Sequence, residues 1–154
     1  MTIKPRIVAT QMRKATPDDV PAIMIALETL SDEIPINMDK ENNRNALGII
    51  VAECCAQNSW VALDETDHVI GFLLGKKYKF DGIALPYGGV LKGYRKQGRF
   101  SKLLSKAKAL KRPLHVDVNH ENKSGMAARL VKEGFVKEQG SPFPSQDCFI
   151  WLPK

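Results

Sequence analysis

The sequence predicts a single domain of the α/β (α+β) class, in which about seven strands and four helices share one hydrophobic core. Its 154 residues, 44% of them hydrophobic and 26% charged, suit one domain of ordinary composition. Short apolar runs typical of strands alternate with longer segments whose apolar residues recur every three or four positions, as in amphipathic helices. The expected order is strand, two helices, three strands, helix, strand, helix and two strands.

The first strand is expected over residues 7–13, and it leads into a helix that begins near Pro17 or after Asp19. Thr16 and Asp19 have the spacing of a capping box, with Asp in place of Glu. A cap at Asp19 would place Pro21 in the first turn, where its missing N–H costs nothing. The buried face of this helix is predicted to consist of Val20, Ile23, Met24, Leu27 and Leu30.

A second helix and a β-hairpin follow. The helix is expected from the polar run 39–45 to about Gln57. Residues 59–63 and 69–74 are apolar and β-prone, and the turn-like segment 64–67 joins them as an antiparallel hairpin. The buried face of the helix is predicted to consist of Leu47, Ile50, Val51 and Cys54.

The segment that organises the chain is a strand at residues 83–91, a basic turn containing glycine, and a third helix that starts near Gly98. Between Lys92 and Arg112 there are nine Lys or Arg residues and no acid. A helix N-terminus has unpaired N–H groups and a partial positive charge, and Gly98 leaves both accessible. The segment is therefore typical of phosphate binding. Residues that predict a bulge in the strand are Pro86, Gly88 and Gly89.

The last third of the chain supplies a fifth strand, a fourth helix and a closing hairpin. Residues 114–118 alternate in polarity, which places His115 and Asp117 on one face of the strand. Gly134 is expected to end the fourth helix in a left-handed conformation, and Phe135 returns to the core. The last two strands and their connection are expected at residues 136–139, 148–152 and 142–144.

The organising segment resembles the central motif of the GNAT superfamily of N-acetyltransferases, which reads roughly V-x-x-x-x-[RQ]-x-x-G-x-[GA]. Val90, Arg95 and Gly98 match this motif, whereas Phe100 stands where the family usually has Gly or Ala. The resemblance implies a single GNAT-like domain over residues 1–154, with a mixed, mostly antiparallel central sheet of about seven strands flanked by four helices. A second matching stretch follows the fifth strand and comprises Asn122, Ala127, Gly134 and Phe135.

In this family the turn binds the pyrophosphate of coenzyme A, and the bulged strand pairs its backbone with the pantetheine arm. The resemblance therefore implies acetyl-CoA as the cosubstrate, and no metal is expected. The residues expected to bind the coenzyme are Val90, Leu91, Arg95, Lys96, Gln97, Gly98, Arg99, Phe100, Ser101 and Asn122.

The resemblance also implies the chemistry, in which a neutral amine attacks the thioester directly in a ternary complex. The acid that protonates the leaving thiolate is usually a Tyr, but Leu130 occupies that position here. Ser124 or Tyr87 could replace the Tyr, or the thiolate could leave unaided because a thiol pKa is about 8.5. The candidates for the base that removes the amine proton are Asp117, His115, Glu28, Asp32 and Glu33.

Two other functions stay open at this stage. A nucleic-acid-binding module without catalysis would use the basic stretch, but the positive charge is concentrated in one segment, which favours a local phosphate site. A non-haem iron oxygenase would use His115 and Asp117 as two ligands of a facial triad. That site needs a second, distal histidine, and only His120 follows. The four helical patterns also do not suit the all-β fold of such enzymes.

The remaining features concern location and partners. The odd number of cysteines predicts neither a disulfide framework nor a zinc site, so Cys54, Cys55 and Cys148 are interpreted as small buried apolar residues. No apolar run approaches 18 residues and the first residues do not resemble a signal peptide, so a cytoplasmic protein without a membrane partner is expected. The expected partners are acetyl-CoA and an amine on an unidentified small molecule or protein. Nucleic acid is not expected, and a homodimer is left open.

Overall fold

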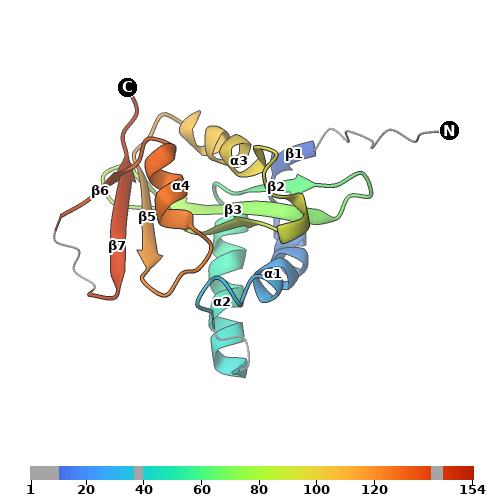
Figure 1. Ribbon diagram of the computed structural model, residues 1–154. Helices are drawn as coiled ribbons and strands as arrows, with labels where there is room; N and C mark the ends of the chain where they lie inside the picture. Colours follow the sequence, from blue (N-terminus) through green and yellow to red (C-terminus); the bar gives the residue numbers. More distant parts are fainter. Residues whose placement is uncertain (1–10, 37–39, 140–143) are drawn as a thin grey trace.

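The computed structural model describes residues 11–36, 40–139 and 144–154. The predictions for residues 7–10, for Asp39 and for the connection at 142–143 lie outside these residues. In the described part, seven strands form one sheet in the order β1-β2-β3-β4-β5-β7-β6, accompanied by four α-helices (Figure 1). Neighbouring strands are antiparallel except for the parallel pair β4 and β5. The predicted mixed, mostly antiparallel sheet with four helices is confirmed.

The first turn of the chain after β1 (Gln11–Lys14) is held by one buried carboxylate. The predicted capping box of Thr16 and Asp19 surrounds a short 3₁₀ turn, Pro17–Asp19, from which α1 (Val20–Thr29) continues. Asp19 accepts hydrogen bonds from the Thr16 N–H and, at both carboxylate oxygens, from the Arg13 guanidinium, each at 2.8 Å. These bonds lower the pKa of Asp19. They join β1 to the start of α1.

The other elements follow the predicted order. The ends of β2, β4 and β5 differ from the prediction by one residue each. Three strands differ more, because β3 ends three residues further than expected, β6 is only two residues long, and β7 begins two residues earlier. The second helix ends two residues before the expected Gln57. The remaining elements are α2 (Glu41–Cys55), β2 (Trp60–Leu63), β3 (Val69–Lys77), β4 (Ile83–Val90), α3 (Arg99–Lys108), β5 (Leu114–Asn119), α4 (Met126–Lys132), β6 (Val136–Lys137) and β7 (Gln146–Trp151).

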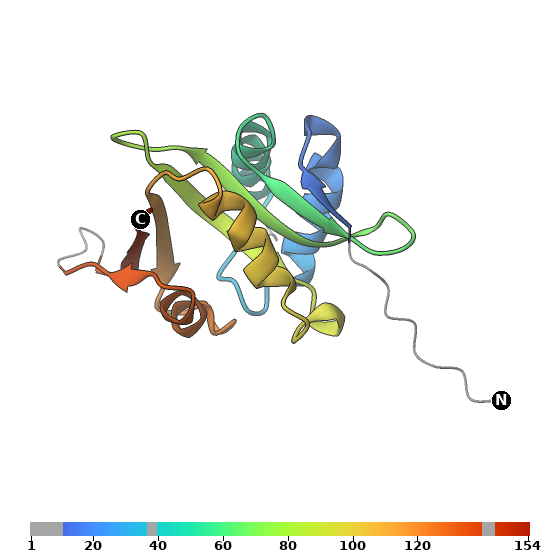
Figure 2. The same cartoon turned by 90° about the horizontal axis from the view of Figure 1, so that it is seen from above.

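The sheet separates two hydrophobic cores, so the prediction of one shared core is wrong. On one face α1 and α2 pack on side chains of β2 and β3, and on the other face α3 and α4 pack on side chains of β3, β4 and β5 (Figure 2). Alternate residues of β3 serve the two cores, since Phe72 and Leu74 belong to the first and Leu73 to the second. Both helix layers are therefore required to bury the central strand.

The sheet opens between β4 and β5. Within the described ladder, Ile83 pairs with Leu114 and Ala84 with His115, after which β4 continues beside β3 and β5 beside β7. The β3–β4 register shifts by one residue where Leu85 and Pro86 lie, so the predicted bulge is confirmed at the proline and not at the two glycines that follow. The backbone of β4 beyond Ala84 consequently has an edge that β5 does not pair.

Candidate active site

Two adjoining cavities occupy the opening between β4 and β5. The smaller one is about 50 Å³ and lies at the bulge, and the larger one is about 350 Å³ and extends toward the end of β4 and α4. Four residues line both cavities and so lie at their junction, namely Ile34, Gly88, Phe100 and Met126.

The N-terminus of α3 lies just after β4, and Gly98 is its N-cap residue, as predicted. The backbone of Gly98 has φ = 73°, a left-handed conformation in which other residues are strained, and a Cβ there would meet nothing within 4 Å. Lys102 donates its N–H to the Gly98 carbonyl at 3.0 Å, so the N–H groups of 98–101 precede the first hydrogen bond of the helix. The backbone conformation, and not lack of space, favours a glycine here.

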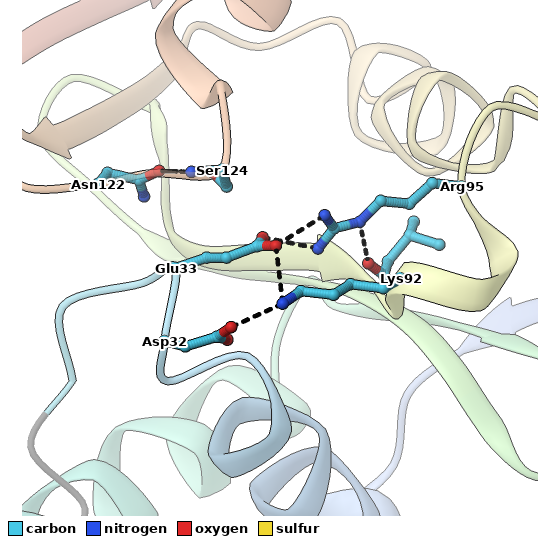
Figure 3. Close-up of polar contacts among 7 residues, drawn as sticks. Asp32, Glu33, Lys92, Arg95, Asn122 and Ser124 are labelled. Carbon is cyan, nitrogen blue, oxygen red and sulfur yellow. Dashed lines mark hydrogen bonds and ion pairs between the residues drawn. The ribbon is translucent and has the colours of Figure 1, made fainter.

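Two arginine side chains hold the loop before α3 in place. The Arg95 Nε donates to the Val90 carbonyl at 2.8 Å, and its two terminal nitrogens donate to the Glu33 carboxylate at 2.9 and 2.7 Å (Figure 3). The buried Arg99 donates to the Tyr94 carbonyl at 2.8 Å and to the Gln97 side chain at 2.7 Å.

These contacts occupy the side chains of several residues that the sequence predicts to bind the coenzyme. The side chains of Arg95, Gln97 and Arg99 bind within the protein, and the Ser101 hydroxyl donates to Glu133 at the end of α4. The groups of this loop that can hold an anion are therefore mainly backbone N–H groups, to which the exposed Lys96 adds a diffuse positive charge.

Glu33 is the residue of the site whose role the sequence did not reveal. It follows α1, and it joins both sides of the opening, because its carboxylate binds Arg95 and its carbonyl accepts the Lys123 N–H at 2.8 Å. Figure 3 shows its carboxylate between Arg95 and Lys92, with Asp32 bound to the same lysine at 2.6 Å. The hydrogen bond from Arg95 lowers the pKa of Glu33, and that from Lys92 lowers the pKa of Asp32. Both carboxylates are thereby weakened as the bases that the sequence suggested.

The three catalytic candidates are divided between the two cavities. Tyr87 and Asp117 both line the smaller cavity, and burial raises the pKa of the Tyr87 hydroxyl. Ser124 lines the larger cavity and donates both its hydroxyl and its N–H to the Asn122 side chain (Figure 3). The ring of His115 instead packs on that of Tyr78, with 4.6 Å between the ring centres. The structure therefore brings Tyr87 and Asp117 together and separates Ser124 from them.

Phe100 and Leu130, the two residues that depart from the GNAT pattern, both pack against neighbours in the structure. Phe100 packs beside Gly88, where an added Cβ would lie 3.3 Å from the Phe100 ring and 2.8 Å from Leu73. The missing side chain at Gly88 thus makes room for the large side chain at Phe100. Leu130 is 1% exposed and lines the smaller cavity, so the usual position of the Tyr is filled by a buried aliphatic side chain.

Comparison with solved structures identifies the fold. An acetyltransferase of the GNAT family from Staphylococcus aureus superposes with a TM-score of 0.69 over 92% of this chain and 98% of its own, at 14% identity. The fold is the GNAT fold. PaiA N-acetyltransferase from Thermoplasma acidophilum, in complex with coenzyme A, gives 0.66 over 95% and 99% at 14% identity. NAA60 from Arabidopsis thaliana, in complex with acetyl-CoA, gives 0.63 over 94% and 99% at 19% identity. No protein-family model and no curated protein sequence matches the chain.

The GNAT fold bears directly on the oxygenase alternative. His115 and Asp117 lie in a sheet covered by helices on both faces, which is not the all-β fold that such an oxygenase requires. In the part of the chain that the structure describes, no three His, Cys, Asp or Glu residues are grouped so that they could hold a metal ion. Across the same residues, every helix is too short or too polar to cross a membrane.

Proposed function

We propose that this protein transfers an acetyl group from acetyl-CoA to a primary amine of a small molecule or protein, by direct attack in a ternary complex. The observation that carries the proposal is the opening between β4 and β5, which leads to the glycine-capped N-terminus of α3. The proteins from T. acidophilum and A. thaliana that share the fold were crystallised with coenzyme A and acetyl-CoA, which supports the same cosubstrate here.

The residues of the opening fit this coenzyme in three places. The backbone N–H groups of 98–101 suit the diphosphate, since they precede the first hydrogen bond of α3 and lie at the positive end of the helix. The free edge of β4 from Leu85 to Val90 suits the amide groups of the pantetheine arm, which can pair with it as an added strand. Leu91 directly follows that edge in the chain and Asn122 lines the smaller cavity, and both belong to the proposed coenzyme site.

Acetyl-CoA supplies a thioester carbonyl that an amine can attack, and the protein then has to move one proton off the amine and one onto the sulfur. Asp117 is the proposed base because it is exposed at the rim of the smaller cavity and can meet an incoming amine. Tyr87 is the proposed acid, because burial raises its pKa and keeps its hydroxyl protonated. As the new C–N bond forms, the C–S bond breaks, and the products are an amide and the free thiol of coenzyme A.

The test of the coenzyme site compares two substitutions of nearly the same shape, Gly98→Asp and Gly98→Asn. Both residues tolerate the left-handed conformation of Gly98 better than other side chains, so the fold should persist. Asp places a negative charge beside the diphosphate and Asn does not. We expect coenzyme A binding, measured by calorimetry, to weaken at least tenfold more for Asp than for Asn, which is about 1.4 kcal/mol.

The control for general charge is Lys102→Ala, one turn further along α3, which should change the affinity much less because its charge is screened by solvent. Equal losses for Lys102→Ala and Gly98→Asp would indicate a basic surface, as in the nucleic-acid alternative. No loss with Gly98→Asp would remove the coenzyme site. The acceptor is sought by thiol release from acetyl-CoA with polyamines, aminoglycosides, amino acids and peptides. A cytoplasmic location and a homodimer stay predictions.

A further inference from the structure

Six aliphatic side chains, from β3, β4, β5, α3 and α4, form the inner wall of the smaller cavity. The polar side chains that line it are Tyr87, Asp117 and Asn122. The backbone of β4 from Leu85 to Gly88, which β5 does not pair, lines it as well. The aliphatic side chains favour an apolar chain as the occupant, and the backbone edge can pair with the polar groups that precede this chain. The aliphatic members are Leu73, Leu85, Leu104, Val116, Val118 and Leu130.

The position of this cavity relates it to the coenzyme. The larger cavity is lined by the last residues of β4, from Gly88 to Val90, and the smaller cavity by the residues before them, from Leu85 to Gly88. A chain that runs along β4 away from the α3 N-terminus therefore meets the larger cavity first and the smaller one last. Phe100 and Met126 line both cavities and flank the passage between them.

The volume sets how much can enter. One water-sized group needs about 10–15 Å³ of cavity measured in this way. The 50 Å³ of the smaller cavity thus accommodates about four such groups. An acetyl group places a single methyl beyond its carbonyl and would leave most of this space empty, whereas a butyryl chain would fill most of it.

We propose that the smaller cavity receives the acyl chain, and that the protein prefers propionyl and butyryl thioesters of coenzyme A to the acetyl thioester. This proposal rests on the proposed function, whose coenzyme site and reaction it keeps. Each additional buried methylene should tighten binding about fourfold up to butyryl. Hexanoyl exceeds the space and should bind more weakly than butyryl. Succinyl should also bind more weakly, since its carboxylate would lie beside Asp117 and the aliphatic side chains, and no Lys, Arg or His lines this cavity.

The experiment measures the dissociation constants of coenzyme A and of its acetyl, propionyl, butyryl, hexanoyl and succinyl thioesters by calorimetry on the intact protein. A maximum at propionyl or butyryl is the expected result. Equal affinity from acetyl to hexanoyl, or a maximum at acetyl, overturns the acyl-chain proposal while leaving the coenzyme site intact. Failure of coenzyme A and all thioesters to bind removes the proposed function itself.

A matched pair of variants locates the chain in the cavity. Val118→Ile adds one methylene to the inner wall, and we expect it to weaken butyryl binding about fourfold with acetyl binding unchanged. Val61→Ile makes the same change in the core on the opposite face of the sheet and should alter neither. A loss of butyryl binding in both variants, or in neither, overturns the placement. The thioester series on the unaltered protein decides the preference even if a variant does not fold.

Discussion

The link between Glu33 and Arg95 predicts a measurable coupling in stability. The pair is bidentate, with nitrogen–oxygen distances of 2.9 and 2.7 Å, and the two side chains are 13% and 33% exposed. Exposed ion pairs contribute about 0.2–1 kcal/mol, whereas hydrogen bonds to charged groups that are partly shielded from water contribute about 1.5–3 kcal/mol. The geometry and exposure place this pair in the second group, so we expect a coupling of about 2 kcal/mol.

The coupling is measured by a double-mutant cycle of Glu33→Gln, Arg95→Gln and the double variant in urea at pH 7. The cycle is needed because Arg95→Gln also removes the hydrogen bond to Val90, which the double variant lacks as well. The neighbouring pair of Asp32 and Lys92 is the matched control, since both of its side chains are more than half exposed and its coupling should be much smaller.

The pH dependence provides a second measure of the same link. The pKa of Glu33 is lowered in the folded protein from 4.5, so its contribution to stability is fully present above pH 4.5 and is lost as the pH falls through the folded pKa. The coupling should therefore shrink in acid. A coupling under about 0.5 kcal/mol at pH 7, or one that persists unchanged in acid, would refute the assigned role of Glu33.

Three further predictions concern chemistry at single side chains. Asp117→Asn should lower kcat by about 100-fold or more and leave the affinity for coenzyme A unchanged. Tyr87→Phe should lower kcat in the same way, because the hydroxyl is proposed to protonate the thiolate. An unchanged kcat for Tyr87→Phe would mean that the thiolate leaves unaided. Burial raises the pKa of Cys54 and of Cys55 to about 11. Iodoacetamide at pH 8 should therefore modify the partly exposed Cys148 first in the folded protein. In urea all three cysteines should react, and mass spectrometry identifies the modified residues in both cases. Modification of Cys54 or Cys55 before Cys148 in the folded protein would contradict the assigned burial of the two cysteines.

Local signals in the sequence were sufficient for the order of elements and for the start of α3. Helical and alternating apolar patterns depend on which face of an element is buried, and that requirement is visible in any short segment. The capping box at Thr16 and the caps at Gly98 and Gly134 are also local, because each satisfies or orients backbone groups within a few residues.

The contacts that shape the site could not be predicted in this way. Glu33 and Arg95 are 62 residues apart, and either one alone has the same appearance as an exposed charge. The sequence predicts a bulge in a segment that contains one proline and two glycines. Only the tertiary structure shows that Pro86 lies at the register shift. Gly88 has a different reason to be small, because Leu73 and Phe100 pack against it. Such effects depend on neighbours brought together by the sheet, so a one-dimensional pattern cannot distinguish them.

The arginines of the loop bind within the protein, so they would act on the proposed phosphate site without touching the phosphate. Arg95 ties the end of β4 to Glu33, and Arg99 ties Tyr94 to Gln97, so the backbone N–H groups before α3 are held in position before any ligand arrives. A binding loop that is already ordered loses less conformational entropy when its ligand binds. Because the Glu33 carbonyl also accepts the Lys123 N–H, the order of the proposed coenzyme loop is linked to the segment before α4. We therefore expect the basic motif to contribute to the proposed site mainly through the loop conformation it enforces, and only secondarily through its net positive charge.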